Sequence, residues 1–177
     1  NIVIIKYDPI GNILWSKVLD LNLGDTPNKI GIDNNNDIII VGSTYSTFVD
    51  GFVAKYSSAG TFLWSKTIPA ALSDKPTSLI AIAGGGYVVT GNTSSFNNFS
   101  DSPFLLKIDG NDNIEWFHTY EASNMSFGSS VIQCADNGFA ISGGYAQYLG
   151  INLVKTDATG NHGCDSLISF KTRKLSF

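Results

Sequence analysis

A short tryptophan motif recurs along this chain at a nearly constant distance. The sequence LWSK at positions 14–17 returns at 63–66, and a looser version, EWFH, stands at 115–118. A lysine recurs in the same frame at positions 6, 55, 107 and 155, in steps of 49, 52 and 48. A unit of about fifty residues with several short apolar runs cannot bury its own faces and has to stack on its neighbours. The sequence therefore predicts a repeat protein.

The best-preserved unit contains four apolar runs, at 77–82, 87–90, 104–108 and 114–119. The turns between the first and second runs and between the third and fourth runs are short and rich in Gly, Asn and Asp. These residues tolerate positive φ and are typical of β-hairpins, so neighbouring strands are expected to be antiparallel. Each period thus predicts one four-stranded sheet.

The composition favours strands over helices. Ten of the eleven basic residues are lysine and thirteen of the fifteen acidic residues are aspartate, so the helix formers Glu and Arg are scarce. Runs such as 38–41 are apolar at consecutive positions, which means that both faces of a sheet are covered. We predict an all-β fold, a β-propeller segment of four-stranded antiparallel blades. A β-sandwich is the competing interpretation, but it does not require a fifty-residue repeat.

The repeat frame divides residues 1–166 into about three and a half blades. We expect a half blade at 2–19, whole blades at 28–68 and 77–119, and a last, degenerate blade at 129–166, with a terminal strand or linker at 167–177. Closed propellers have roughly four to eight blades. The remaining blades are therefore expected outside this chain, either before residue 1 in a longer parent protein, which we favour, or in another chain.

Charge and motifs exclude several classes of function. The net charge is −4 with no basic stripe, which argues against nucleic-acid binding. No apolar run approaches the roughly 18 residues of a transmembrane segment. The lone histidines, His118 and His162, have no partners at metal-ligand spacing, and no constellation of catalytic residues stands out. We therefore predict no catalytic residues, no metal and no cofactor.

The turn-and-strand segments 6–17 and 54–66, together with 52–55 and 87–93, resemble the β-propeller repeats of secreted bacterial proteins known as the SBBP type. The resemblance covers nearly the whole chain. It implies a propeller fold and export to the surface or surroundings of a Bacteroidota-like bacterium, and it implies no particular reaction. The expected localisation is extracellular or on the cell surface.

The repeated residues are interpreted as structural. We expect Trp15, Trp64 and Trp116 to pack between blades, and we assign a structural role to the recurring Gly42, Gly91 and Gly143. The four repeated lysines are expected to pack their stems between blades, with the ammonium near a turn carboxylate or carbonyl. Each has a polar residue two positions further on, on the same strand face: Asp8, Ser57, Asp109 and Asp157.

Candidate binding residues lie on the face of longer connections, predicted at 20–28, 45–50, 69–76, 94–103, 121–128 and 145–150. The connections between second and third strands each carry two aromatic residues three positions apart, and two of them carry an acidic residue at the rim. These residues are Tyr45, Phe48, Asp50, Phe96, Phe99, Asp101, Tyr145 and Tyr148. They either cap the blade edges or form a contact surface for a protein or glycan partner.

The functional hypothesis is a non-enzymatic propeller scaffold of a secreted or cell-surface bacterial protein, which binds a protein or glycan partner through its long-loop face. The alternative is part of a glycosidase-like or quinoprotein-like propeller enzyme whose catalytic residues lie in the missing blades.

Overall fold

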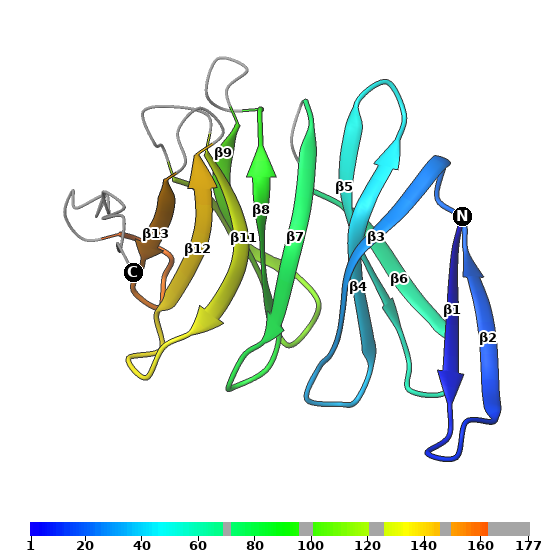
Figure 1. The fold of residues 1–177 in the computed structure, drawn as a ribbon. Coiled ribbons are helices and arrows are strands. Elements are labelled where there is room, and N and C mark those ends of the chain that lie inside the picture. Colours follow the sequence, from blue (N-terminus) through cyan, green and yellow to red (C-terminus); the bar gives the residue numbers. More distant parts are fainter. Residues whose placement is uncertain (69–71, 96–100, 121–125, 146–149, 163–177) are drawn as a thin grey trace, which may run out of the picture.

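The computed structural model describes residues 1–68, 72–95, 101–120, 126–145 and 150–162, and in these ranges it contains thirteen β-strands and no helix (Figure 1). The strands form four antiparallel sheets in chain order. Sheet 1 is β1 (Ile2–Tyr7) and β2 (Ile13–Leu19), and sheet 2 is β3 (Leu23–Ile32), β4 (Ile38–Tyr45), β5 (Val49–Tyr56) and β6 (Phe62–Thr67). Sheet 3 is β7 (Asp74–Ala81), β8 (Tyr87–Thr93), β9 (Ser102–Ile108) and β10 (Ile114–Thr119). Sheet 4 is β11 (Ser126–Gln133), β12 (Phe139–Tyr145) and β13 (Ile151–Lys155).

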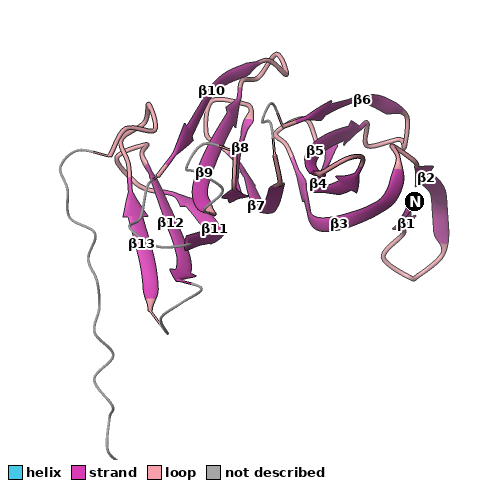
Figure 2. Cartoon of the chain, turned by 90° about the horizontal axis from the view of Figure 1, so that it is seen from above, coloured by secondary structure: helices cyan, strands magenta, loops and turns pink. Residues whose placement is uncertain are grey.

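The all-β, antiparallel prediction is confirmed in the part of the chain that the structure describes. The turns between first and second strands and between third and fourth strands lie at the lower ends of the sheets in Figure 1, and the connection between β4 and β5 lies at the upper end. The upper connections at 20–22 and 46–48 are shorter than the lower turn at 8–12, so the predicted contrast in length is wrong for sheets 1 and 2. In Figure 2, β3 and β7 lie on one side of the row of sheets, and β6 and β10 lie on the other. No helix able to cross a membrane occurs among these residues.

The first strands begin earlier than the sequence predicted. β3 begins at Leu23 instead of residue 28, β7 at Asp74 instead of 77, and β11 at Ser126 instead of 129. The predicted connections at 20–28, 69–76 and 121–128 are correspondingly too long, because polar and proline-containing stretches that read as loops continue each first strand across a β-bulge. The predicted terminal segment 167–177 lies outside the described residues.

The short hairpins between β1 and β2 and between β9 and β10 are closed by an aspartate at their first position. The Asp8 carboxylate accepts the backbone N–H groups of Ile10 and Asn12 at 3.0 and 2.8 Å. Asp109 accepts the equivalent N–H groups at 2.9 and 2.8 Å. A side chain that satisfies its own turn in this way fixes the hairpin and, with it, the register of the strands.

The repeated glycines stand opposite a bulge in the first strand of each sheet. The bulge residues are Asn28, Thr77 and Ser129, and Gly42, Gly91 and Gly143 lie across from the residue that precedes each bulge. A Cβ atom on any of these glycines would overlap the carbonyl oxygen of Thr26, Lys75 or Phe127, respectively. The glycine recurs because the bulge brings the neighbouring backbone too close for any side chain.

Successive sheets pack face to face through three apolar clusters. Sheets 1 and 2 share Ile4 and Phe52, sheets 2 and 3 share Val41 and Val89, and sheets 3 and 4 share a third such cluster. The three tryptophans are partly buried against these clusters, one at each interface. Trp64 stacks on Tyr87 of the next sheet with ring centroids 6.4 Å apart. Burial between sheets is therefore the main source of order in the fold.

Candidate functional site

The predicted aromatic residues of sheet 2 lie at the end of the sheet where β4 turns into β5. Tyr45 is the last residue of β4 and Phe48 lies in the turn that follows, where the Ser46 N–H donates to the Phe48 carbonyl at 3.0 Å. Both rings are about half exposed, at 54% and 47%. The prediction of a long connection at 45–50 is wrong, because β4 and β5 pair as far as Tyr45 and Val49, which leaves only residues 46–48 between them.

The two predicted rim carboxylates bind neighbouring polar groups. Asp50 accepts the Ser46 hydroxyl at 2.6 Å, and Asp101 accepts the Asn92 side-chain amide at 3.1 Å. The backbone carbonyl of Asp101 also accepts the Ser126 N–H at 2.9 Å, which ties sheet 3 to sheet 4. Both aspartates therefore hold local structure on this face.

The other predicted binding residues are placed only in part. Tyr145 is the last residue of β12, where its backbone pairs with Ser126. Phe96, Phe99 and Tyr148 lie outside the described residues. The structure therefore brings together Tyr45, Phe48 and Asp50 at the upper end of sheet 2.

A groove of about 440 Å³ lies between sheets 2 and 3 beside Tyr45. Its lining comes from the first two strands of both sheets and from Val49 at the start of β5, and every lining side chain except this valine carries a polar group. The lining residues are Thr26, Asn28, Ser43, Tyr45, Val49, Lys75, Thr77 and Asn92. The groove therefore presents hydroxyls, amides and one ammonium beside an exposed aromatic ring.

Hydrogen bonds to the neighbouring sheet hold two groove residues in place. The bulge residue Asn28 donates its side-chain amide to the Pro76 carbonyl of sheet 3 at 2.7 Å. The equivalent residue of sheet 3, Thr77, donates its hydroxyl to the Gly128 carbonyl of sheet 4 at 2.7 Å. The bulge residues at this repeat position thus link sheet 2 to sheet 3 and sheet 3 to sheet 4, and these bonds fix two polar side chains of the groove.

Two buried aspartates occupy the same position in sheets 2 and 3, one residue before the groove residues Thr26 and Lys75. Burial favours a raised pKa for Asp25, but the backbone N–H groups of Leu21 and Asn22, which donate to its carboxylate at 2.9 and 3.3 Å, help to lower that pKa below its usual value. The pKa of Asp74 is raised to about 6 because burial disfavours its charge, and neither of its carboxylate oxygens accepts a hydrogen bond from the described residues. One repeat position therefore holds carboxylates with opposite shifts.

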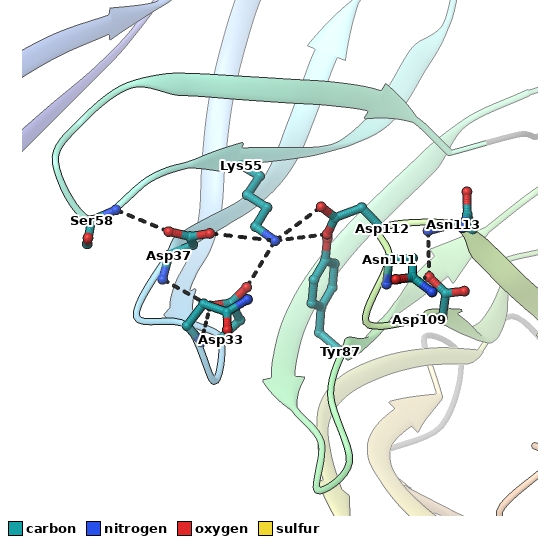
Figure 3. Close-up of polar contacts among 10 residues, drawn as sticks. Asp33, Asp37, Lys55, Ser58, Tyr87, Asp109, Asn111, Asp112 and Asn113 are labelled. Carbon is teal, nitrogen blue, oxygen red and sulfur yellow. Dashed lines mark hydrogen bonds and ion pairs between the residues drawn. The ribbon is translucent and has the colours of Figure 1, made fainter.

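A second polar cluster lies at the short-turn end of the same two sheets and is centred on Lys55 (Figure 3). The Lys55 side chain is 5% exposed, and its ammonium lies 3.0 Å from Asp33, 2.9 Å from Asp112 and 3.8 Å from Asp37. The Tyr87 hydroxyl donates to the same Asp112 carboxylate at 3.1 Å. Because Asp112 and Tyr87 belong to sheet 3, the cluster fastens two sheets together.

The ionisation of this cluster follows from its contacts. Burial acts to lower the pKa of Lys55, but hydrogen bonds and charge from Asp112 and Asp33 raise it above its usual value. Burial acts to raise the pKa of Asp112, and hydrogen bonds from Lys55 and Tyr87 contribute to lowering it overall. The ammonium lies between the carboxylates, and the described residues contain no group of three or more His, Cys, Asp or Glu side chains arranged to hold a metal.

Lys6, Lys55 and Lys155 bind a turn carbonyl or carboxylate, as predicted, but through residues other than those two positions further on. Lys6 donates to the Ser58 carbonyl of the next sheet at 2.7 Å, and Lys107 pairs with Glu115 at 3.0 Å. Lys155 pairs with Asp136 at 2.7 Å. Three of the residues two positions further on, Asp8, Asp109 and Asp157, instead accept backbone N–H groups of their own turns.

Sequence reasoning missed most of the groove. Asn28, Thr77 and Asn92 read as ordinary loop or strand residues, and the groove depends on which sheet lies beside which. The available signal was the polar residue that follows a proline in both first strands, at Pro27-Asn28 and Pro76-Thr77. A repeated proline and polar pair inside a strand is typical of a bulge.

No family model matches this chain, and no curated protein matches it.

Proposed function

We propose that the chain is a segment of a β-propeller from a secreted or cell-surface bacterial protein, and that its long-loop face binds a glycan. Four successive antiparallel sheets that pack face to face through repeated contacts support the propeller part of this proposal. The repeat's resemblance to SBBP-type sequences supports export. The role is binding, without catalysis by this chain.

The observation that carries the glycan proposal is the groove beside Tyr45. Its rim offers a half-exposed aromatic ring, and its walls offer hydroxyl and amide groups such as those of Thr26, Ser43 and Asn92. A sugar ring has apolar C–H faces and a belt of hydroxyl groups, so a flat aromatic surface beside neutral hydrogen-bonding groups complements it. The volume of about 440 Å³ is within the range of small-molecule sites.

The fixed orientation of the groove's polar side chains favours a ligand-binding role for the groove. Asn28 and Thr77 are held by bonds to the next sheet, so a ligand meets groups that are already oriented. A protein partner would use the wider surface that includes Phe48, and it is the alternative occupant of the same face.

The test is a glycan-array screen of the chain followed by NMR titration with the best oligosaccharide found. Replacing Tyr45 by Ala removes the aromatic rim and is expected to weaken binding about two- to tenfold, since a well-placed aromatic contact is worth roughly 0.5–1.5 kcal/mol. Tyr7→Ala is the matched control, because Tyr7 is equally exposed at 54% but lies on sheet 1, away from the groove. Equal loss of binding in both variants, or no chemical-shift change at groove residues, would contradict the proposal.

A further inference from the structure

One charged side chain, that of Lys75 on β7, lines the groove between sheets 2 and 3. The other described residues that line the groove are neutral, and none of them is an aspartate or a glutamate. Lys75 is exposed, and it forms no ion pair with any residue that the structure describes. Its ammonium is therefore available to an anionic ligand.

The repeat does not require a lysine at this position. The residue whose carbonyl faces the repeated glycine is Lys75 in sheet 3, but it is Thr26 in sheet 2 and Phe127 in sheet 4. The repeated lysines of the third strands differ from Lys75, because each of them binds a carbonyl or carboxylate of the protein. The packing of the sheets therefore does not account for the positive charge of Lys75.

The backbone that carries Lys75 is held firmly. Its carbonyl lies in the space that a Cβ on Gly91 would occupy, and the buried Pro76 follows directly. The Pro76 carbonyl accepts the side-chain amide of Asn28 from sheet 2 at 2.7 Å. The root of the lysine side chain is therefore fixed beside the groove, and a ligand has to order only the flexible stem.

The neighbouring carboxylates do not occupy the groove. Asp74 precedes Lys75, but it pairs with Thr93 whereas Lys75 pairs with Asn92, so the two side chains lie on opposite faces of the sheet. The Asp101 carboxylate accepts the Asn92 side-chain amide at 3.1 Å and does not line the groove. The charge that the groove presents to a ligand is therefore positive.

We infer that the glycan bound in this groove is acidic, and that the Lys75 ammonium binds the carboxylate of a uronic acid residue in the oligosaccharide that stacks on Tyr45. This inference rests on the glycan-binding function proposed above. A uronic acid has the apolar C–H face and the hydroxyl groups of a neutral sugar, and it adds one carboxylate that is ionised at neutral pH. The hydroxyls of Thr26 and Ser43 bind the sugar hydroxyls, and Lys75 distinguishes the acidic sugar from the neutral one.

The contribution of Lys75 is expected to be modest because this residue is exposed. An exposed ion pair changes an affinity by about two- to fivefold at low ionic strength, and salt screens it. An acidic sugar is therefore expected to bind more tightly, by about that factor, than a neutral form of the same shape.

NMR titration at about 20 mM salt tests this inference with trigalacturonate, trimannuronate and a hyaluronan tetrasaccharide, each compared with its methyl ester. The ester keeps the sugar ring and removes the charge. At least one acid is expected to shift the signals of groove residues and to bind about two- to fivefold more tightly than its ester, with the difference lost at about 500 mM salt. Lys75→Gln is expected to abolish the difference, and Lys75→Arg, which restores a cation, is expected to keep it.

Lys29→Gln is the matched control, because Lys29 is an exposed lysine of the neighbouring first strand, β3, that does not line the groove. It is expected to keep the preference for the acid, whereas Tyr45→Ala is expected to weaken acid and ester alike. Every ester binding as tightly as its acid, or equal loss of preference in Lys29→Gln and Lys75→Gln, overturns the inference and leaves glycan binding itself in place. If neither acids, esters nor the oligosaccharides of the glycan array shift groove signals, the proposed function fails, and this inference fails with it.

Discussion

Replacing Asp74 by Asn is expected to stabilise the protein at neutral pH and to leave its stability nearly unchanged at pH 4. The Asp74 side chain is fully buried at the start of β7. Burial raises its pKa to about 6, the nearby Asp50 carboxylate adds to the shift, and neither Asp74 carboxylate oxygen accepts a hydrogen bond from the described residues. Keeping this carboxyl group ionised in the folded state therefore costs free energy.

The size and sign of the effect follow from proton linkage. The folded state binds the Asp74 proton more tightly than the unfolded state, whose pKa is near 3.8. Protonation of Asp74 therefore stabilises the folded state. This stabilisation is complete below about pH 4 and is lost as the pH rises through about 6. A shift of roughly two pKa units corresponds to about 3 kcal/mol in the free energy of unfolding. Asparagine keeps the shape without the charge, so the variant is expected to gain up to that amount above pH 7.

Urea unfolding at several pH values between about 4 and 8 measures this difference. Asp25→Asn is the matched control, because Asp25 occupies the same repeat position but its pKa is lowered by hydrogen bonds that outweigh burial. The Asp25 carboxylate stabilises the folded state at pH values above its pKa in the unfolded chain, and this stabilisation is lost as the pH falls. Asp25→Asn is therefore expected to be less stable than the wild type at pH 7.5. Parallel stability curves for wild type and Asp74→Asn across the whole pH range would refute the reasoning.

Two further substitutions test how the sheets are held. Lys55→Met leaves the Asp33 and Asp112 carboxylates facing each other without their shared cation. Chemical denaturation is expected to show a free energy of unfolding lower by about 3 kcal/mol at pH 7, and a smaller loss at pH 4. Gly91→Ala places a Cβ 2.7 Å from the Pro76 Cα and closer still to the Lys75 carbonyl oxygen, so a loss of about 2 kcal/mol or more is expected in the same assay. Gly110→Ala, whose nearest contacts are 3.8 Å away, is expected to be nearly neutral, and equal losses at both glycines would contradict the bulge argument.

The strands and hairpins could be predicted because their determinants are local and repeated. Three units carry the same tryptophan, lysine and glycine positions, and their turns carry Gly, Asn or Asp where the backbone needs them. The start of each first strand was harder to predict. Pro27 and Pro76 read as loop residues, but a bulge accommodates each of them inside a strand.

The candidate site could be predicted only in part. Tyr45 was found because aromatic residues recur at the ends of second strands, whereas the groove beside it also depends on Lys75 and Thr77 of the next sheet. The partner of Lys55 was likewise hidden, since Asp112 lies 57 residues away in the sequence. Contacts between units depend on the distance between stacked sheets, and the period of the sequence repeat does not predict that distance.

Residues that differ between repeats make the polar contacts between neighbouring sheets, and these contacts differ at the three interfaces. At each described interface a polar group reaches the turn that follows the third strand of the next sheet. Lys6 donates to the Ser58 carbonyl, Lys55 pairs with the Asp112 carboxylate, and the Tyr120 hydroxyl donates to the Gly160 carbonyl at 2.7 Å.

The turn residue changes together with its partner. Gly11, Gly60 and Gly160 supply the positive φ that this turn position requires, but Asp112 adopts a φ of 65° at the same position. A left-handed conformation is unfavourable for a residue with a side chain, so glycine is the default choice there. Asp112 is retained at that cost where its carboxylate can pair with a buried lysine. At the next interface Glu115 of the same sheet binds Lys107, and Tyr120 makes the contact to the following turn. A non-glycine residue at this position of the repeat therefore indicates a side-chain contact across the interface.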